Sequence, residues 1–135
     1  MVTGACLCGG VRYEVSEPFV SAGYCHCTRC QRRTGAAAAA SARIAPGSLR
    51  VVAGEELVRC WDPGDGGWLK CFCSVCGGAL WSRHAEETEL VAVRLGTVDG
   101  DPGIRPSYRQ YVAYAASWEQ IPEDGLPRFP EQRGA

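Results

Sequence analysis

The residues of this sequence that could do chemistry are its cysteines, nine in a chain of 135 residues. Three of them fall within residues 24 to 30, which read YCHCTRC, at C-x-C-x2-C spacing. The start, MVTGACLCGG, has no charged leader followed by an apolar run, so we expect no signal peptide and a cytoplasmic location. A reducing cytoplasm disfavours disulfides, and an odd total prevents complete pairing within one chain. Thiolate ligation of a metal is the better explanation.

Two other cysteine pairs have the spacing of a closed metal site. Cys73 and Cys76 are separated by two residues and followed by two glycines, which suits a tight turn around a zinc ion. Cys6 and Cys8 would point to the same face of an extended segment. Together the four thiolates would complete a structural zinc site that joins the first strand to the middle of the sheet. The alternative is a set of buried free thiols.

The YCHCTRC stretch predicts a second metal site with a free position. Cys25 and Cys27 can share a strand face and Cys30 can return from the next turn, whereas His26 should point away from them. Three protein ligands and an open fourth position are typical of a catalytic or substrate-binding zinc. Two alternatives remain: closure of the site by another side chain, such as Cys60 or Cys71, and no second metal at all.

Other readings of these residues are weaker. The C-x2-C pairs lack the strand-to-helix context that tunes redox-active thiols, and Cys60 is most simply a small buried hydrophobic residue. The densest basic cluster, Arg29, Arg32 and Arg33, is typical of a solvated turn, although it lies beside the cysteines and could meet a small anionic ligand.

The elements that must position these cysteines are predicted to be mainly β-strands. Seventeen glycines and eight prolines interrupt the sequence so often that few stretches long enough for a helix remain. Ala36 to Ala40 is ambiguous, because alanine favours helix while the flanking Gly35 and Pro46 favour a strand. The family resemblance given below implies a strand here. The clearer strand candidates are Val11 to Val15, Leu49 to Val52, Leu57 to Trp61, Leu80 to Ser82, Leu90 to Leu95 and Tyr108 to Tyr114.

Length and composition predict a single globular domain. No composition shift divides residues 1–130, and residues 131–135 are expected to form a flexible tail. The net charge of -1 gives no electrostatic case for binding nucleic acid or an anionic membrane, and no segment has the roughly 18 apolar residues of a transmembrane helix. Nothing in the sequence indicates the oligomeric state.

The ordered motifs resemble one known family, that of the glutathione-dependent formaldehyde-activating enzymes, also called the CENP-V/GFA domain family. The resemblance covers nearly the whole chain. Its motifs are G-x-C-x-C-G-x-V (Gly4 to Val11), YCHCTRCQRRTGA (Tyr24 to Ala36), FCSVCGGAL (Phe72 to Leu80), LGTVDG (Leu95 to Gly100) and W-x-x-I-P-E-D-G-L-P-R-F (Trp118 to Phe129). Cys60 and Cys71 lie outside this pattern.

The resemblance implies a zinc-bound β-tent of stacked antiparallel sheets, with two metal sites. It places a structural zinc on Cys6, Cys8, Cys73 and Cys76, and a second zinc with an open position on Cys25, Cys27 and Cys30. The implied reaction is that of a carbon-sulfur lyase, which joins formaldehyde to glutathione as S-hydroxymethylglutathione. The side chains of Arg29, Arg32 and Arg33 and the backbone around Thr34 and Gly35 are then candidates to contact the glutathione-like thiol.

Two other functions remain open on the sequence alone. The chain could be a non-catalytic zinc-bound scaffold or binding module, which the closed four-cysteine group favours. It could also be a sensor of metal or oxidant that uses Cys60 and Cys71 as spare thiols.

Overall fold

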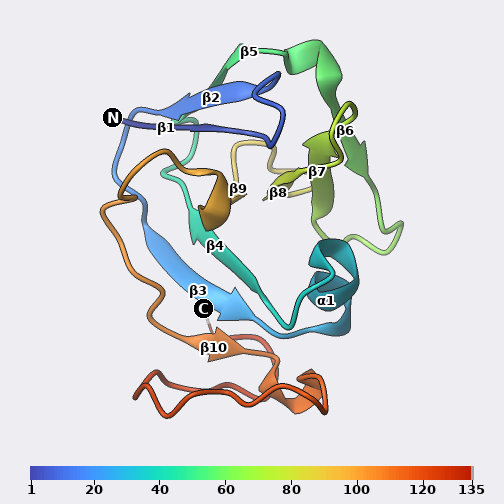
Figure 1. Cartoon of the computed structure of the whole chain (residues 1–135), viewed down its shortest axis with the longest axis vertical. Coiled ribbons are helices and arrows are strands. Elements are labelled where there is room, and N and C mark those ends of the chain that lie inside the picture. The colour runs from blue at the N-terminus through green and yellow to red at the C-terminus, as the bar shows by residue number, and fades with distance from the viewer. Residues whose placement is uncertain (135) are drawn as a thin grey trace.

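The computed structural model describes residues 1–134, which form two β-sheets with one short helix (Figure 1). The smaller sheet is antiparallel in the order β1-β2-β5, and the larger one has the order β10-β3-β4-β9-β8-β7-β6 with only β10 and β3 parallel. The strands are β1 (Val2–Ala5), β2 (Arg12–Val15), β3 (Ser21–Cys25), β4 (Ala39–Arg43), β5 (Leu49–Ala53), β6 (Val58–Trp61), β7 (Leu69–Cys73), β8 (Ala79–Arg83), β9 (Val91–Arg94) and β10 (Arg109–Gln110). The helix α1 spans Thr28–Thr34, and 3-10 turns occur at Glu55–Leu57, Leu95–Thr97 and Val112–Tyr114.

The prediction of a mainly β fold with stacked antiparallel sheets is confirmed. Five of the predicted strands agree with β2, β5, β6, β8 and β9 to within one residue at each end. The candidate from Tyr108 to Tyr114 is a strand only at β10, because Tyr111 takes a left-handed backbone conformation and a 3-10 turn follows. Of Ala36 to Ala40, only the last two residues belong to β4.

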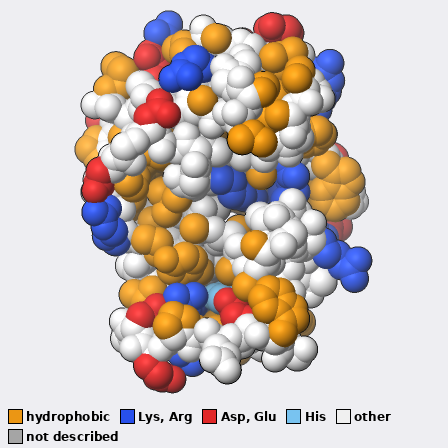
Figure 2. Space-filling model, viewed as in Figure 1, with side chains coloured by type: hydrophobic (Ala, Val, Ile, Leu, Met, Phe, Trp, Pro, Cys, Tyr) orange, Lys and Arg blue, Asp and Glu red, His pale blue; other side chains and the backbone are white. Residues whose placement is uncertain are grey.

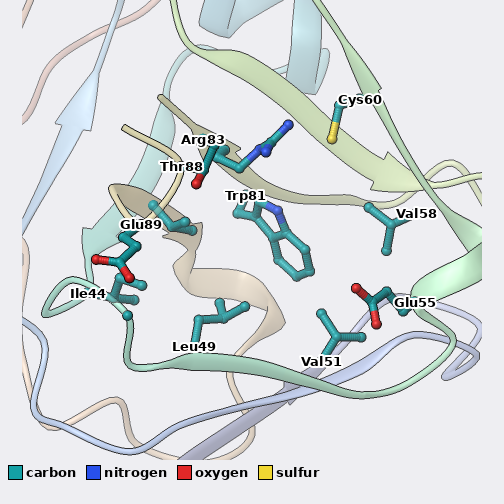
Figure 3. A pocket seen from close by; sticks show the side chains of 12 residues that line it. Ile44, Leu49, Val51, Glu55, Val58, Cys60, Trp81, Arg83, Thr88 and Glu89 are labelled. Carbon is teal, nitrogen blue, oxygen red and sulfur yellow. The ribbon is translucent and has the colours of Figure 1, made fainter. Parts of the chain in front are cut away.

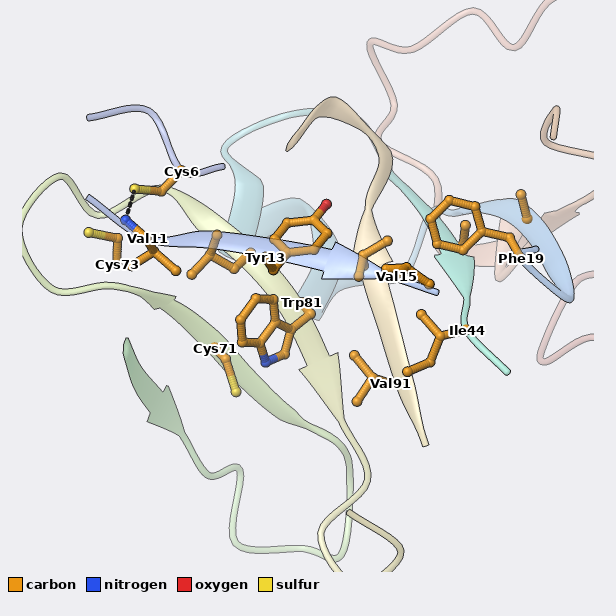
Figure 4. Packing of buried hydrophobic residues seen from close by; sticks show 14 residues of the cluster. Cys6, Val11, Tyr13, Val15, Phe19, Ile44, Cys71, Cys73, Trp81 and Val91 are labelled. Atoms are coloured by element: carbon orange, nitrogen blue, oxygen red, sulfur yellow. Dashed lines mark hydrogen bonds between the residues drawn. The ribbon is translucent and has the colours of Figure 1, made fainter. Parts of the chain in front are cut away.

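The core lies between the two sheets and is centred on two aromatic rings (Figure 4). Tyr13 of β2 and Trp81 of β8 meet edge to face, with ring centroids 5.7 Å apart. The Tyr13 hydroxyl is satisfied at 2.7 Å from the Thr97 hydroxyl, so this buried polar group has a hydrogen-bond partner. Val11 and Val15, before and at the end of β2, and Val91 and Val93 of β9 are buried in the same core, and each such side chain contributes about 1.5–3 kcal/mol.

The larger sheet has two faces of opposite character. Cys71, Trp81 and Val93 occupy neighbouring strands in register and point into the core. The residues next to them along each strand must point to the other face. That face carries polar side chains and, at one end, the cysteines of YCHCTRC.

Helix α1 places the end of the YCHCTRC stretch. The Cys27 sulfur caps its first turn by accepting a hydrogen bond from the Cys30 N–H at 3.2 Å. Gly35 ends the helix with φ 68°, a conformation that glycine adopts without strain. The sequence reading missed this helix because seven residues are too few to show an apolar period.

Cys60 and Cys71 form a disulfide, which corrects the argument against disulfides in this chain. The two residues face each other across the antiparallel pair β6 and β7. Cys60 is exposed and is therefore not a buried hydrophobic residue, whereas Cys71 is fully buried. Neither sulfur is free to close a metal site, and the pair is not a set of spare thiols.

Substituting Cys60 with serine should lower the free energy of unfolding by about 2–3 kcal/mol, because the bond closes a short loop and restricts the unfolded chain. Denaturant unfolding with and without a phosphine reductant measures this. The reductant should bring the wild type down to the Cys60→Ser variant and leave the variant unchanged. A wild-type unfolding curve that is the same with and without the reductant would contradict the disulfide.

The segment after β10 returns along the larger sheet, and the contacts of residues 131–134 are defined. The Tyr111 N–H donates to the Glu131 carbonyl, and the Arg133 N–H donates to the Gln110 side chain. Ala135, the last residue of the expected tail, lies outside the described residues. None of the helices within residues 1–134 is long and apolar enough to cross a membrane.

Candidate functional site

Four cysteines meet where the turn between β1 and β2 approaches the turn between β7 and β8. The Cys6 and Cys8 sulfurs are 3.6 Å apart, Cys8 and Cys73 are 3.9 Å apart, and all four sulfurs, including that of Cys76, lie within 4.8 Å of one another. Four sulfurs at about 2.3 Å from a tetrahedral zinc would be about 3.8 Å apart. The donor set therefore fits a zinc ion, and it connects the smaller sheet to the larger one.

Backbone amides support these four sulfurs. The Val11 N–H donates to the Cys6 sulfur at 3.3 Å, and the Gly10 N–H donates to the Cys8 sulfur at 3.4 Å. A hydrogen bond from the Gly78 N–H lowers the pKa of Cys76 to about 6, so this thiol loses its proton readily. Cys6 and Cys8 lie in a turn rather than in the extended segment we expected, and the turn still brings their sulfurs together.

The second cluster contains the three cysteines of YCHCTRC, whose sulfurs also lie within 4.8 Å of one another. Cys25 ends β3, Cys27 caps α1 and Cys30 lies in the first turn of that helix. This corrects the expectation that the pair Cys27 and Cys30 lacks a strand-to-helix context. Contact with the Cys25 sulfur lowers the pKa of Cys27 to about 2, and contact with the same sulfur raises the pKa of Cys30. The thiols therefore share negative charge at close range, which a cation would stabilise.

No fourth His, Cys, Asp or Glu joins this cluster among residues 1–134. The His26 ring is buried away from the three sulfurs, as predicted, between Glu119 and Arg109. A guanidinium can only donate, so His26 Nε2 accepts from Arg109 at 3.3 Å and Nδ1–H donates to Glu119 at 2.8 Å. His84 instead accepts hydrogen bonds from the backbone of its own turn. Within the described residues, the group that could hold a metal ion here consists of these three cysteines.

The three-cysteine cluster forms part of the wall of a cavity of about 680 Å³ on the polar face of the larger sheet. The remaining wall comes from β3, β4 and β7 to β10, from the loop before β7 and from residues 132–134. Among the described residues, the wall contains no Asp, Glu or His. Five basic side chains line it instead: Arg29, Arg43, Lys70, Arg94 and Arg133.

Of the five residues predicted to contact a thiol, only Arg29 lines the cavity. Its guanidinium is paired with Asp65 at 2.8 Å. Arg33 turns toward the carbonyl of Cys71 and the ring of Phe72, and the Thr34 hydroxyl donates to the carbonyl of Cys30. Arg32 and Gly35 are not part of the cavity wall.

The sequence reading missed the polar residues on the strands of the cavity, Ser41, Lys70, Ser82 and Arg94. Each stands inside an otherwise small or apolar strand, and the only available signal was the charged position in the run VAVRLG. Which strands are neighbours, and therefore which of these side chains meet, is set by pairing between distant segments.

A second cavity, of about 510 Å³, opens between β5 and β8 (Figure 3). Its wall is mainly aliphatic around Trp81, with Glu55, Arg83 and Glu89 at its edges. No sulfur of either cysteine cluster reaches it. The chemistry available to thiolates is therefore confined to the first cavity.

Comparisons with known proteins identify the family of this chain. A protein of Halomonas elongata, named "Putative glutathione-dependent formaldehyde-activating enzyme", is 28% identical over 110 residues, which cover 75% of this chain and 68% of that protein. A crystal structure of a Rhodobacter sphaeroides protein is 29% identical and superposes with a TM-score of 0.60, over 73% of this chain and 89% of that one. The family model described as "Glutathione-dependent formaldehyde-activating enzyme" (GFA) matches residues 1–114. Since this match includes both cysteine clusters and most of the chain, the protein belongs to the GFA family.

Proposed function

We propose that this chain is a zinc-dependent carbon-sulfur lyase that reversibly joins a small thiol, glutathione or an analogue, to formaldehyde or a related electrophile. The observation that carries the proposal is the cluster of Cys25, Cys27 and Cys30, which has three ligands, a free position and a cavity in front of it. The thiol partner follows from the family and from the name of the Halomonas relative.

The chemistry needs only what this site can offer. Zinc held by the three thiolates would lower the pKa of a substrate thiol at the free position and keep its sulfur as thiolate. The sulfur lone pair then forms a bond to the carbonyl carbon, the carbon-oxygen π bond breaks, and the oxygen takes the proton that the thiol lost. Reactants and product balance without an oxidant or a further reactant.

The side chains around the cavity support this addition. The wall formed by residues 1–134 has no carboxylate or imidazole to act as a general base, and a thiol that binds as thiolate does not need one. Basic side chains around the cavity favour an anionic thiol over its neutral form. The second, four-cysteine cluster would hold a structural zinc, because all its positions are taken by protein sulfurs.

Metal analysis with calorimetric titration of glutathione tests the proposal. We expect two zinc ions per chain, binding of glutathione, and an S-hydroxymethyl adduct detectable by NMR when formaldehyde is added. Two bound zinc ions without thiol binding or adduct formation would favour the alternative, a zinc-bound scaffold. A second zinc already coordinated by four protein atoms would also exclude the proposed chemistry.

A further inference from the structure

A continuous polar row crosses four neighbouring strands on the floor of the three-cysteine cavity. It runs from Ser41 on β4 through Arg94 on β9 and Ser82 on β8 to Lys70 on β7, in the order in which these strands pair. Arg94 donates to both serine hydroxyls, at 2.8 Å each, and Lys70 donates to Ser82 at 3.3 Å. We call these four residues the polar row.

The polar row has more hydrogen-bond donors than acceptors. Arg94 is 9% exposed, and its Nε–H is buried without a partner. The Ser82 oxygen already accepts two hydrogen bonds, so its own proton must be donated elsewhere, and the Lys70 ammonium has further protons available. A group that accepts several hydrogen bonds would satisfy all of these donors at once.

The charges of Arg94 and Lys70 also favour a bound anion. Arg94 is buried and Lys70 is half-buried, and burial lowers the pKa of each. Neither forms a salt bridge with a carboxylate in the described part of the chain, whereas Arg29 at the cavity edge is paired with Asp65. Figure 2 shows Lys and Arg side chains gathered near the middle of the face that Figure 1 presents. Unpaired buried cations are costly, and a bound anion offsets that cost.

The thiolates of the metal cluster are one source of negative charge for the row, but they do not use its donors. Their charges act on Arg94 and Lys70 through space, and no hydrogen bond joins them to either residue in residues 1–134. The Arg94 Nε–H and the Ser82 proton therefore remain available to a ligand.

The row lies close enough to the three cysteines to hold the other end of a small ligand. Cys25 pairs with Ala39 on β4, and Ser41 follows two positions later on the same face. Two residues along a strand span about 7 Å. A carboxylate on the row and a reacting atom at the cysteines can therefore belong to one short molecule.

We infer that the polar row is an oxyanion subsite, which binds a carboxylate of the molecule that reacts at the three-cysteine cluster. This inference rests on the proposed function and extends it by assigning the residues that bind a carboxylate of the substrate. The carboxylate can come from the thiol or from the electrophile, and in either case Arg94 and Ser82 donate to its oxygens while Lys70 adds charge.

Matched pairs of ligands separate the two sources. Calorimetry on the metal-loaded protein would compare 3-mercaptopropionate with the neutral 3-mercaptopropanol, and glyoxylate with the neutral glycolaldehyde. The carboxylated member of at least one pair should bind better, and Arg94→Met should weaken its binding roughly 10- to 100-fold, the usual effect of losing charge-assisted hydrogen bonds. The neutral member should change by less than about threefold.

Two further kinds of variant complete the test: substitutions of the other row residues, and a control that removes a positive charge elsewhere. Ser82→Ala and Lys70→Met should each weaken carboxylate binding, which decides the matter if Arg94→Met does not fold. Arg83→Met removes the same charge from the opposite face of β8, where Arg83 lines the aliphatic cavity, and should leave carboxylate affinity unchanged.

The outcomes also distinguish the subsite from the proposed function. Equal binding of carboxylated and neutral ligands to the wild type would overturn the subsite while leaving thiol addition intact. Glyoxylate binding that depends on Arg94, in a protein that binds neither thiol, would support the subsite and remove the thiol function.

Discussion

Replacing Cys73 with serine is expected to unfold the protein at room temperature. Cys73 is fully buried, and its sulfur belongs to the cluster that connects the turn of the smaller sheet to the larger sheet. Structural zinc ions contribute about 10–16 kcal/mol in small zinc-binding peptides, which is as large as the whole stability of most domains. We expect a loss of more than about 5 kcal/mol, measured by circular dichroism, together with one zinc ion fewer per chain.

A matched control for this variant lies in the same turn. Val75 is exposed between Cys73 and Cys76, so Val75→Ser introduces the same side chain without touching a sulfur and should leave the melting temperature and the zinc content unchanged. A strong chelator should reproduce the effect of Cys73→Ser on the wild type. If Cys73→Ser melts within a few degrees of the wild type, the four-cysteine cluster does not hold the sheets together.

The division of cysteines into two clusters was predictable because it depends on local spacing. C-x2-C and C-x-C pairs bring two sulfurs together through one turn, whatever the rest of the fold does. Cys6 and Cys8 were expected in an extended segment and lie in a turn, and their sulfurs still come together. Which strands lie next to one another in the sheets was not predictable, because it depends on pairing between segments that are far apart.

Strands with small residues were the hardest to find. β1 and β3 contain Gly4 and Gly23, and a side chain at either position would collide with the ring of Tyr13 or Tyr108, respectively. The close approach of an aromatic ring from another segment therefore requires glycine at these two strand positions, where glycine itself disfavours a strand prediction. The same limit hid the disulfide, because Cys60 and Cys71 meet only through the register of β6 and β7.

The polar row illustrates the same point at the functional level. Arg94 and Lys70 look like ordinary surface charges in the sequence, but alternation along β9 and β7 turns them into the cavity beside the three cysteines. The sequence predicted basic ligand contacts beside the cysteines, at Arg29, Arg32 and Arg33, which lie on α1. Lys70 and Arg94, which line the cavity, lie on strands that are distant from those cysteines in sequence.

Replacing Cys27 with serine should abolish thiol binding and leave the fold intact. Serine is a good helix N-cap, so its hydroxyl can take over the hydrogen bond that the Cys27 sulfur accepts from the Cys30 N–H. The cluster would then keep only two thiolates. Since groups that merely support a metal ligand change affinity about 10- to 100-fold, loss of a ligand should weaken glutathione binding at least about 100-fold.

Calorimetry with glutathione, a zinc determination and a thermal melt on the same samples check this expectation. Thiol binding and one of the two zinc ions should both be lost, while the melting temperature stays within a few degrees of the wild type. Thr28→Ser, at the exposed neighbouring position, is the control that should keep both the zinc ion and the thiol affinity. A Cys27→Ser variant that unfolds as Cys73→Ser does would make both clusters structural, and the free position at Cys25, Cys27 and Cys30 would then have no catalytic role.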